Sequence, residues 1–259
     1  LAPSPAALAP SATPAAPPEA PPLRIAIFVI AYNAVRHLIR TIERIPPEIE
    51  KKVAEIFVID DASSDNTYFA ALGYKAERGL TKLSVFRNAR NQGYGGNQKV
   101  GYRYALDRGH DVVAMLHGDG QYAPEALPEL LAPIERDGAD VVFGSRMQVK
   151  GRALDGGMPL YKYVGNRILT EYANYFLGMS MTEFHSGYRA YSLHALKKLD
   201  FSQMTGDFHF DTQIIIKIHH QGLRLREVPI PTYYGNEICY VNGFKYAKDV
   251  FFAYLKPFT

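Results

Sequence analysis

The chain has 259 residues, of which 47% are hydrophobic and 21% charged, and its formal net charge is +3. This length and composition suit one large α/β domain with a substantial core. The charge is too mild to indicate a nucleic-acid partner, although it suits an anionic substrate or membrane surface. A single cysteine, Cys239, excludes an internal disulfide and favours a cytoplasmic location. No apolar run reaches the length of a spanning helix, so we expect any membrane contact to be peripheral.

Residues 1–22 consist almost wholly of Ala, Pro and Ser, with Glu19 as their only charge. They contain neither a basic segment nor an uninterrupted apolar stretch of the kind a signal peptide needs. We therefore expect a disordered Ala/Pro-rich arm over residues 1–22. A single domain over residues 23–259 would follow, ending in an amphipathic helix.

Short apolar runs alternate with helical patterns over the next 120 or so residues. The predicted strands are Arg24–Ala31, Glu55–Asp60, Leu83–Phe86, Asp111–Leu116 and Asp140–Phe143. Helical spacing occurs over residues 35–45, 97–106 and 124–136, and Pro128 and Pro133 predict that the last of these helices is kinked or begins late. This βαβ rhythm predicts a mostly parallel sheet with helices on both faces, whose ligand lies beyond the carboxyl ends of the strands.

Two later segments have apolar residues at helical spacing. In the first we expect core positions, namely Leu160, Val164, Ile168, Leu169, Tyr172 and Phe176. The second combines an apolar stripe with three lysines: Phe244, Ala247, Phe251, Tyr254, Leu255 and Phe258, with Lys245, Lys248 and Lys256. This pattern suits a helix lying on anionic lipid, and it equally suits a helix that packs on its own domain or on a partner.

Adjacent carboxylates, Asp60 and Asp61, end the second predicted strand. They are able to accept hydrogen bonds from a nucleotide base or ribose, or else to cap the next helix, and the residue types leave both roles open. For Ser64 and Asp65 we expect helix capping.

Residues 87–97 form a glycine-rich segment between a strand and a helix, with Arg87 and Arg90 on its near side. It resembles a phosphate cradle. The glycine spacing matches neither the dinucleotide fingerprint nor the P-loop, so a purely conformational role stays open.

His117, Asp119 and Gln121 occupy alternate positions where the fourth predicted strand ends. In an extended segment their side chains share one side, where carboxylate and amide oxygens could hold Mg²⁺ or Mn²⁺. The alternative is a polar turn in which Asp119 caps the helix near Pro124 and His117 is structural.

Seven short signatures occur in a specific order along the chain. They are Ala31-Tyr32-Asn33, residues 59–65, residues 91–95, Asp119-Gly120-Gln121, Gly144-Ser145-Arg146, residues 186–189 and Glu227-Val228-Pro229. Over residues 23–246 the chain resembles the family 2 glycosyltransferases, in particular their dolichyl-phosphate mannosyltransferase-like, polyprenyl-phosphate branch.

The resemblance implies the GT-A fold, an αβα sandwich with a mostly parallel sheet. It also implies metal-dependent, inverting transfer of a sugar from a GDP- or UDP-linked donor to a polyprenyl or dolichyl phosphate. The residues it implies for the donor are Ala31, Tyr32, Asn33, Asp60, Asp61, Asn91, Gly93, Gly118 and Lys162. It places the metal on Asp119 and Gln121, with His117 as a further candidate. The implied catalytic residues are Asp119, Arg146, Glu183 and Arg189, where Arg146 would hold the acceptor phosphate.

Two residues depart from the family pattern. His117 stands where the first aspartate of an Asp-x-Asp motif is common, and Ala34 stands where glutamate usually follows Tyr-Asn. Three other functions therefore stay in view. The first two are a glycosyltransferase with a saccharide or small hydroxylated acceptor, and a pseudoenzyme that binds nucleotide sugars. The third, a nucleotidyltransferase, is disfavoured because its glycine-rich basic signature does not follow the first strand.

Overall fold

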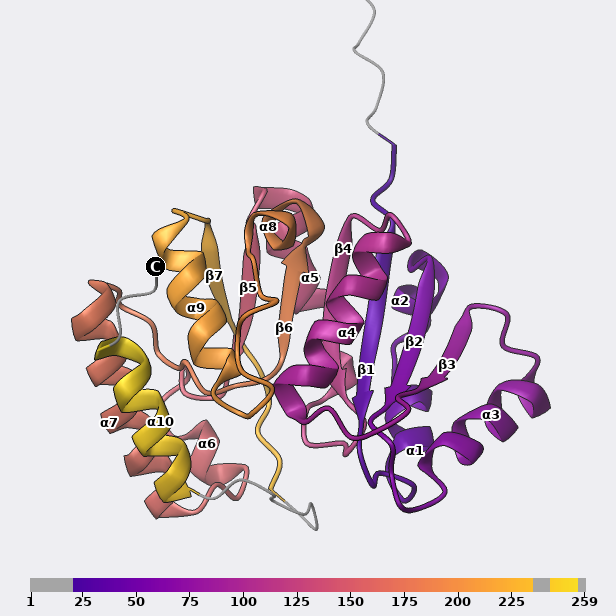
Figure 1. Ribbon diagram of the computed structural model, residues 1–259, viewed down its shortest axis with the longest axis horizontal. Coiled ribbons are helices and arrows are strands. Elements are labelled where there is room, and N and C mark those ends of the chain that lie inside the picture. The colour runs from indigo at the N-terminus through magenta and orange to yellow at the C-terminus, as the bar shows by residue number, and fades with distance from the viewer. Residues whose placement is uncertain (1–20, 235–242, 256–259) are drawn as a thin grey trace, which may run out of the picture.

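The computed structural model describes residues 21–234 and 243–255. Within them lies a seven-stranded sheet in the order β3-β2-β1-β4-β6-β5-β7 (Figure 1). Its strands are β1 (Ile25–Ala31), β2 (Glu55–Asp60), β3 (Leu83–Arg87), β4 (Val112–His117), β5 (Val141–Ser145), β6 (Arg189–Ser192) and β7 (Leu225–Pro229). Strand β6 is antiparallel to β4 and β5, and the other neighbouring strands are parallel. The mostly parallel sheet is therefore confirmed.

Helices cover both faces of the sheet (Figure 1). On one face lie α1 (Leu38–Glu43), α2 (Pro47–Lys52), α3 (Thr67–Arg78) and α5 (Leu127–Asp137). On the other lie α4 (Tyr94–Asp107), α7 (Leu160–Leu177), α8 (Leu193–Lys198), α9 (Phe210–His220) and α10 (Gly243–Leu255). The short α6 (Arg152–Asp155) packs in a small cluster with Met147 and Met158.

Alternation along β1 shows how the sequence builds two cores. Ile25, Ile27 and Val29 belong to one cluster of buried residues, whereas Ala26 and Phe28 belong to the other. Successive side chains of a strand point to opposite faces, so a strand buried on both faces reads as an uninterrupted apolar run.

The prolines set helix boundaries as the sequence indicates, and Pro47 also begins a helix. A 3₁₀ turn occupies η1 (Pro124–Ala126), and α5 begins only at Leu127, so the expected late start is confirmed. Pro46 and Pro47 separate α1 from α2, but Pro47 also opens α2, because the first position of a helix needs no backbone N–H.

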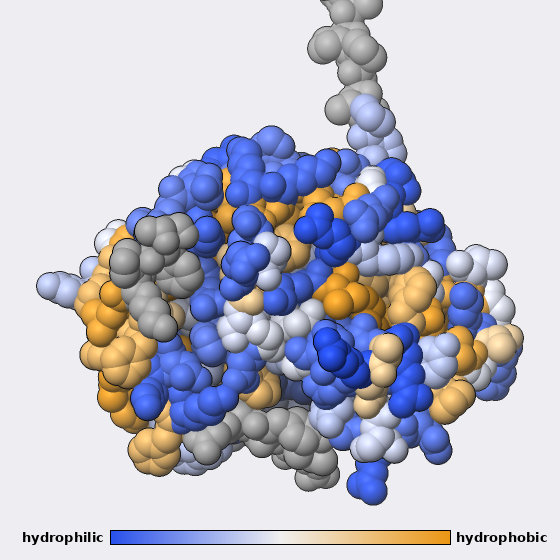
Figure 2. All heavy atoms as spheres, in the orientation of Figure 1, coloured by the Kyte–Doolittle hydropathy of each residue, from blue (hydrophilic) through white to orange (hydrophobic). Residues whose placement is uncertain are grey.

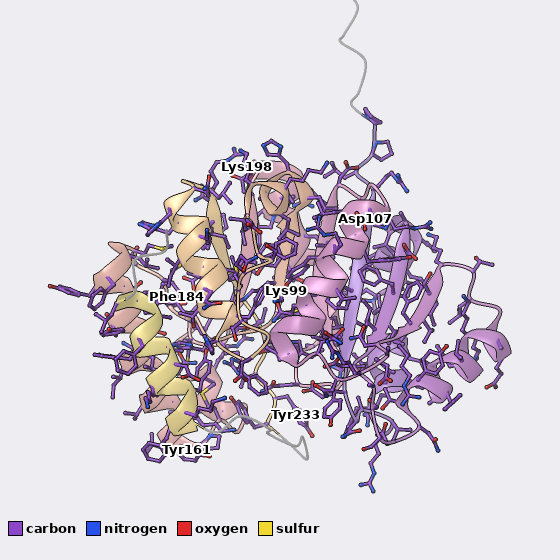
Figure 3. The ribbon with its side chains drawn as sticks, viewed as in Figure 1. Lys99, Asp107, Tyr161, Phe184, Lys198 and Tyr233 are labelled. Atoms are coloured by element: carbon purple, nitrogen blue, oxygen red, sulfur yellow. The ribbon has the colours of Figure 1, made fainter. Side chains whose placement is uncertain are left out.

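The expectation that the apolar residues of α7 form core is wrong for four of them. Leu160, Val164, Ile168 and Phe176 are exposed, while Thr170, Ala173 and Leu177 are buried. Ala173 and Leu177 belong to the core on this face of the sheet, and the exposed apolar residues point away from it. Tyr161, labelled in Figure 3, lies at the outer edge of the molecule, whereas Phe184 lies inside it.

Some predicted features lie outside the described residues. They are residues 1–20 of the N-terminal arm, Cys239, Lys256 and Phe258. In the part of the chain that is described, no helix is both long and apolar enough to cross a bilayer.

Two glycines of the helices offer a matched test of the packing on β1. A Cβ at Gly101 in α4 would lie 2.3 Å from a ring carbon of Phe28, whereas a Cβ at Gly73 in α3 would meet nothing within 4 Å. We expect Gly101→Ala to lower the free energy of unfolding by about 1–3 kcal/mol through overpacking. Gly73→Ala should raise it by up to about 1 kcal/mol through helix propensity. Urea unfolding measures both, and equal effects would contradict this packing.

Candidate active site

The carboxyl ends of the parallel strands bring the predicted site residues to one edge of the sheet. Ala31 pairs with Asp60 across β1 and β2, and Ile30 pairs with His117 across β1 and β4. Because β6 runs the opposite way, its first residue, Arg189, lies at the same edge, opposite Met115. Residues from four strands thus surround this edge.

Asp60 and Asp61 have different environments. The Asp60 carboxylate is fully buried, accepts hydrogen bonds from the Ser63 backbone and hydroxyl, and lies 3.3 Å from Arg87 Nε. Burial raises its pKa. Asp61 Oδ1 accepts hydrogen bonds from Asn88 Nδ2 and from the Gln92 backbone at 2.7 and 2.8 Å. Among the described residues both bonds of Asp61 fall on Oδ1, which leaves Oδ2 for a ligand, whereas Asp60 shapes the loop.

Side chains tie the ends of β1 and β2 together. Asn33 has a positive φ of 48°, its backbone N–H donates to Ser63 Oγ, and its Oδ1 accepts from the Ser64 backbone and hydroxyl. Asp65 lies one residue before the N-cap, Asn66, and accepts from the backbone N–H of Thr67, the first residue of α3, so it closes the turn that leads into the helix but is not its N-cap. The capping expected of Ser64 is wrong, since its hydroxyl bonds Asn33 instead.

Three neighbours of Asn33 have distinct positions. Ala31 ends β1 and is buried, and Tyr32 is 41% exposed. Ala34 is buried, and its backbone N–H donates to Thr67 Oγ1. A glutamate at position 34 would have to enter a buried position, which is consistent with the small residue found there.

The glycine-rich segment does not form a phosphate cradle here. The backbone N–H groups of Gly95 and Gly96, in the first turn of α4, both donate to the carbonyl of Gly206, at 2.8 and 3.1 Å. A Cβ at Gly93 would lie 2.6 Å from that carbonyl oxygen. Asn91 Oδ1 accepts a hydrogen bond from the Gly93 backbone N–H. Asn91 and Gly93, which were expected to bind the sugar donor, thus stabilise the loop itself. The glycines permit close packing of residues 205–207 on the start of α4.

Asp119 and Gln121 follow β4 in a turn and are half-buried. Asp119 Oδ1 accepts from the backbone N–H of Gln121 at 2.9 Å, which fixes the carboxylate. Gly118 is buried, and a Cβ there would lie 3.1 Å from Leu38, so this glycine lets the turn sit close to β1 and α1. Asp119 Oδ2 and the amide oxygen of Gln121 are ligand types that Mg²⁺ and Mn²⁺ accept, and the donor set therefore fits such an ion.

His117 belongs to a buried polar network. Its Nε2 lies 3.3 Å from the hydroxyl of Tyr94, which donates to Asp211 at 3.0 Å. Burial lowers the pKa of His117, so its imidazole is neutral at neutral pH. With Nε2 facing Tyr94, only Nδ1 is left for a metal.

Arg146 and Glu183 form a buried ion pair. Glu183 accepts hydrogen bonds from the Arg146 backbone at 2.7 Å, from its guanidinium, and from Asn166 of α7 at 2.7 Å. Burial alone would raise the pKa of Glu183, but the Arg146 charge and the hydrogen bonds from Arg146 and Asn166 together outweigh burial and hold that pKa below its usual value. Glu227 of β7 accepts from the backbone N–H groups of Thr182 and Glu183 and so fixes this loop. Glu183 is thus an orienting group and a poor general base.

Tyr234 brings the two predicted phosphate-binding cations together. Its hydroxyl accepts from Arg146 Nη1 at 3.1 Å, and Lys162 Nζ lies 5.0 Å from its ring centroid. Sequence reasoning assigned no chemistry to Tyr234, and no spacing signal distinguishes it from its neighbour Tyr233.

Arg189 does not reach a substrate in this structure. It is completely buried, and its guanidinium donates to the carbonyls of Phe184, Ser186 and Asp211. It also lies 3.3 Å from the Asp211 carboxylate. The geometry makes Arg189 an anchor of the loop before β6 and not a phosphate ligand.

Tyr122 lies between His117 and Arg146, and the sequence analysis did not identify it. Its ring meets that of His117 edge to face at 4.8 Å, and the Arg146 guanidinium lies 5.9 Å from its centroid. Its hydroxyl accepts from the Gly187 backbone at 2.8 Å. Its position directly after Gln121 is the sequence feature that could have indicated a place in the site.

His185 connects the same loop to α10. Its Nδ1 lies 2.9 Å from the hydroxyl of Tyr246, and its buried Nε2 has no partner within the described residues. The Arg146 guanidinium also approaches the His185 carbonyl, at 3.4 Å. A helix at the molecular surface is therefore bonded to the loop that holds Glu183.

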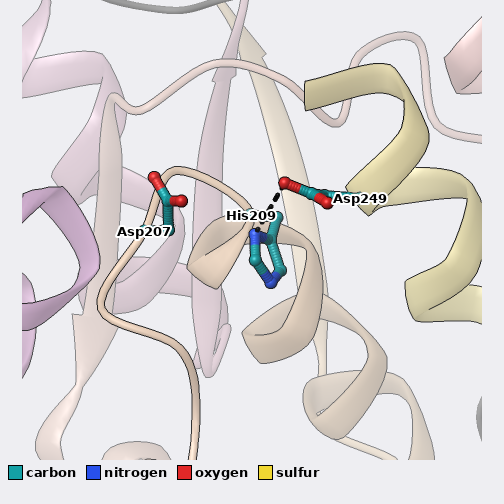
Figure 4. Close-up of side chains that lie close together, drawn as sticks. All are labelled: Asp207, His209 and Asp249. Carbon is teal, nitrogen blue, oxygen red and sulfur yellow. Dashed lines mark ion pairs between the residues drawn. The ribbon is translucent and has the colours of Figure 1, made fainter. Parts of the chain in front are cut away.

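Another group of titratable side chains lies where the loop before α9 meets α10 (Figure 4). One ligand atom each from Asp207, His209 and Asp249 lie within 4.8 Å of one another. His209 and Asp249 approach to 3.7 Å, and Asp207 pairs with Lys245. Since Lys245 already meets the charge of Asp207, we interpret this group as ion pairs that attach α10.

A sheet of this order, with an Asp-x-Gln turn at the end of its central strand, defines a GT-A glycosyltransferase. Glucosyl-3-phosphoglycerate synthase from Mycobacterium tuberculosis, solved with Mn²⁺, uridine diphosphate and phosphoglyceric acid, superposes with a TM-score of 0.67. Its sequence identity is 18%, and the match covers 90% of this chain and 78% of that one. At this identity the likeness shows the fold.

The sequence comparisons agree with this fold. Residues 26–200 match the glycosyl transferase family 2 model, and the chain belongs to this family. An undecaprenyl-phosphate mannosyltransferase from Micrococcus luteus is 29% identical, over 80% of this chain and 83% of that protein. A UDP-N-acetylglucosamine–dolichyl-phosphate N-acetylglucosaminyltransferase from Methanococcus voltae is 30% identical, over 69% of this chain and 74% of that protein. The predicted fold, family and enzyme class are confirmed.

The environment of His185 predicts a pH dependence of stability. Burial lowers its pKa from 6.5 to about 4, against the opposing effect of Glu183 and with the added effect of Arg146 and Arg189. His185 thus binds a proton more readily in the unfolded chain than in the folded one. Its contribution to the free energy of unfolding is complete above pH 6.5 and decreases by about 2–3 kcal/mol as the pH falls towards 4.

Urea unfolding of the wild type and of His185→Gln at several pH values measures this effect. The difference between the two should change over this window, because the other titrating groups are common to both proteins. If the free energies of unfolding of the two proteins changed in parallel with pH, His185 would not be the group that causes the pH dependence.

Proposed function

We propose that this protein transfers a sugar, with inversion, from a nucleoside-diphosphate sugar to a polyprenyl phosphate at a membrane surface. Two relatives that align over most of the chain are named for undecaprenyl- and dolichyl-phosphate acceptors, and this observation carries the proposal.

The donor half of the proposed site lies at the ends of β1, β2 and β4. Asp61 Oδ2 is positioned to accept from the base, and Asp119 and Gln121 would hold Mg²⁺ or Mn²⁺ next to the diphosphate. A divalent ion there supplies neutralisation of the negative charge that develops on the leaving diphosphate. The solved structure of the M. tuberculosis enzyme, with Mn²⁺ and uridine diphosphate, supports this choice of ion.

The acceptor half would consist of Lys162 and Tyr234 together with Arg146, whose buried guanidinium is paired with Glu183 and reaches the Tyr234 hydroxyl through Nη1. A phosphate is already ionised at neutral pH and needs positioning more than deprotonation. The engagement of Glu183 with Arg146 and Asn166 supports such an acceptor, because a hydroxyl acceptor would need a free carboxylate base.

Replacing the metal carboxylate tests the donor half. We expect Asp119→Asn to lower Mn²⁺-dependent sugar transfer by about 100-fold or more while leaving the unfolding midpoint unchanged. Asp107→Asn is the matched control, since Asp107 is exposed at the far end of α4 (Figure 3). Transfer is measured with GDP- and UDP-sugars, with and without a short polyprenyl phosphate. Undiminished transfer by Asp119→Asn would remove Asp119 from the site.

The same assay separates the proposed function from its alternatives. Lipid-independent transfer would indicate a small hydroxylated or saccharide acceptor. Donor binding without turnover under every condition would indicate a pseudoenzyme.

Replacing the arginine tests the acceptor half. Arg146→Lys keeps a charge beside Glu183 but loses the planar fork, so we expect the KM for polyprenyl phosphate to rise about tenfold. The KM for the donor should stay unchanged. Arg136→Lys, an exposed position in the last turn of α5, is the control. A change in donor KM alone would contradict the assignment.

A further inference from the structure

The outward face of α7 is mostly apolar, with Arg167 and Glu171 as its exposed charged residues. Its exposed residues include Leu160, Tyr161, Val164, Ile168, Tyr175 and Phe176, of which Tyr175 is 83% and Ile168 63% exposed. A helix on the surface of a soluble domain normally presents polar residues outward. Figure 2 shows hydrophobic residues gathered along the side of the molecule formed by α7 and α10.

Helix α10 continues this face. Tyr172 of α7 stacks on Phe251 of α10 at 4.9 Å and donates to its carbonyl at 3.1 Å. Val250 and Ala253 are buried, whereas Phe244, Phe252 and Leu255 are exposed, Phe244 to 95%. The two helices together form one aromatic-rich surface, here called the α7/α10 face.

Charge and composition identify the occupant of this face. The two helices carry four basic residues, Lys162, Arg167, Lys245 and Lys248, and two acidic ones, Glu171 and Asp249. Lys245 pairs with Asp207, and Asp249 lies 3.7 Å from His209, so Lys162, Arg167 and Lys248 supply the positive charge of this face. Aromatic and aliphatic side chains beside basic residues suit the boundary between lipid chains and anionic headgroups. If a second copy of the chain packed on this face, its basic residues would lie against those of the first copy and the like charges would repel each other.

The α7/α10 face is also connected to the proposed acceptor site. Asn166 and Lys162 of α7 contact Glu183 and Tyr234, and Tyr246 of α10 bonds His185. A surface in contact with lipid would therefore hold the acceptor residues next to the headgroup region.

We propose that the α7/α10 face docks onto an anionic lipid bilayer, with α7 as its larger part. The inference deepens the proposed function and rests on it, since docking would present a lipid-linked phosphate to Arg146 and Lys162.

Vesicle co-sedimentation without donor or acceptor tests this directly. The full chain is mixed with vesicles of phosphatidylcholine and phosphatidylglycerol, and bound protein is measured against lipid concentration. We expect the wild type to bind and the double variant Ile168→Glu/Phe244→Glu to bind at least about tenfold more weakly. Phe69→Glu is the matched control, because Phe69 is 60% exposed on α3 at the opposite end of the sheet (Figure 1). Urea unfolding verifies that all three proteins are folded.

Three outcomes would overturn the inference. The first is a wild type that does not bind vesicles at low ionic strength, and the second is a Phe69→Glu variant that loses as much binding as the double variant. The third is a wild-type dimer without lipid that the double variant dissociates, which would assign the face to a second copy. A chain that binds vesicles through this face yet transfers no sugar would overturn the proposed function alone.

Discussion

The buried pair of Arg146 and Glu183 is the interaction on which the candidate site depends. Removing two charges from water is costly, and their attraction offsets the cost only when further hydrogen bonds satisfy both groups. Here Glu183 is met by the guanidinium, the Arg146 backbone and Asn166, while Glu227 holds the preceding backbone. The end of β5, strand β7, α7 and the loop before β6 are thereby fixed relative to one another.

A second buried pair, Arg189 with Asp211, fixes the other end of that loop. Asp211 also accepts from Tyr94, whose hydroxyl faces His117, so this pair reaches the end of β4. Tyr122 lies between the two networks and touches both His117 and Arg146. The turn of Asp119 and Gln121 and the proposed acceptor residues are thus connected by one polar framework, the kind of fixed arrangement that electrostatic catalysis requires.

The sequence predicts the sheet and the edge of the site well, for a physical reason. Strands buried on both faces read as apolar runs, and the carboxyl ends of parallel strands must meet, which places Asp61 and Asp119 near each other. Strand β6 was not predicted, because Arg-Ala-Tyr-Ser carries no such run and its arginine is buried through partners that the local sequence does not reveal, namely Asp211 and the carbonyls of Phe184 and Ser186. The roles of Tyr122, Tyr234 and His185 depend on contacts between residues distant in the chain.

Helix α7 shows what an apolar pattern leaves open. Periodicity identifies a helix with apolar residues on one side, but it does not say whether that side faces protein or something else. Here Thr170, Ala173 and Leu177 are buried, while most of the large apolar residues face outward. The buried side supplies Asn166 to Glu183. Because Glu183 is engaged in holding Arg146, it is not free to act as a base, which agrees with the proposed acceptor, a lipid phosphate that is already ionised.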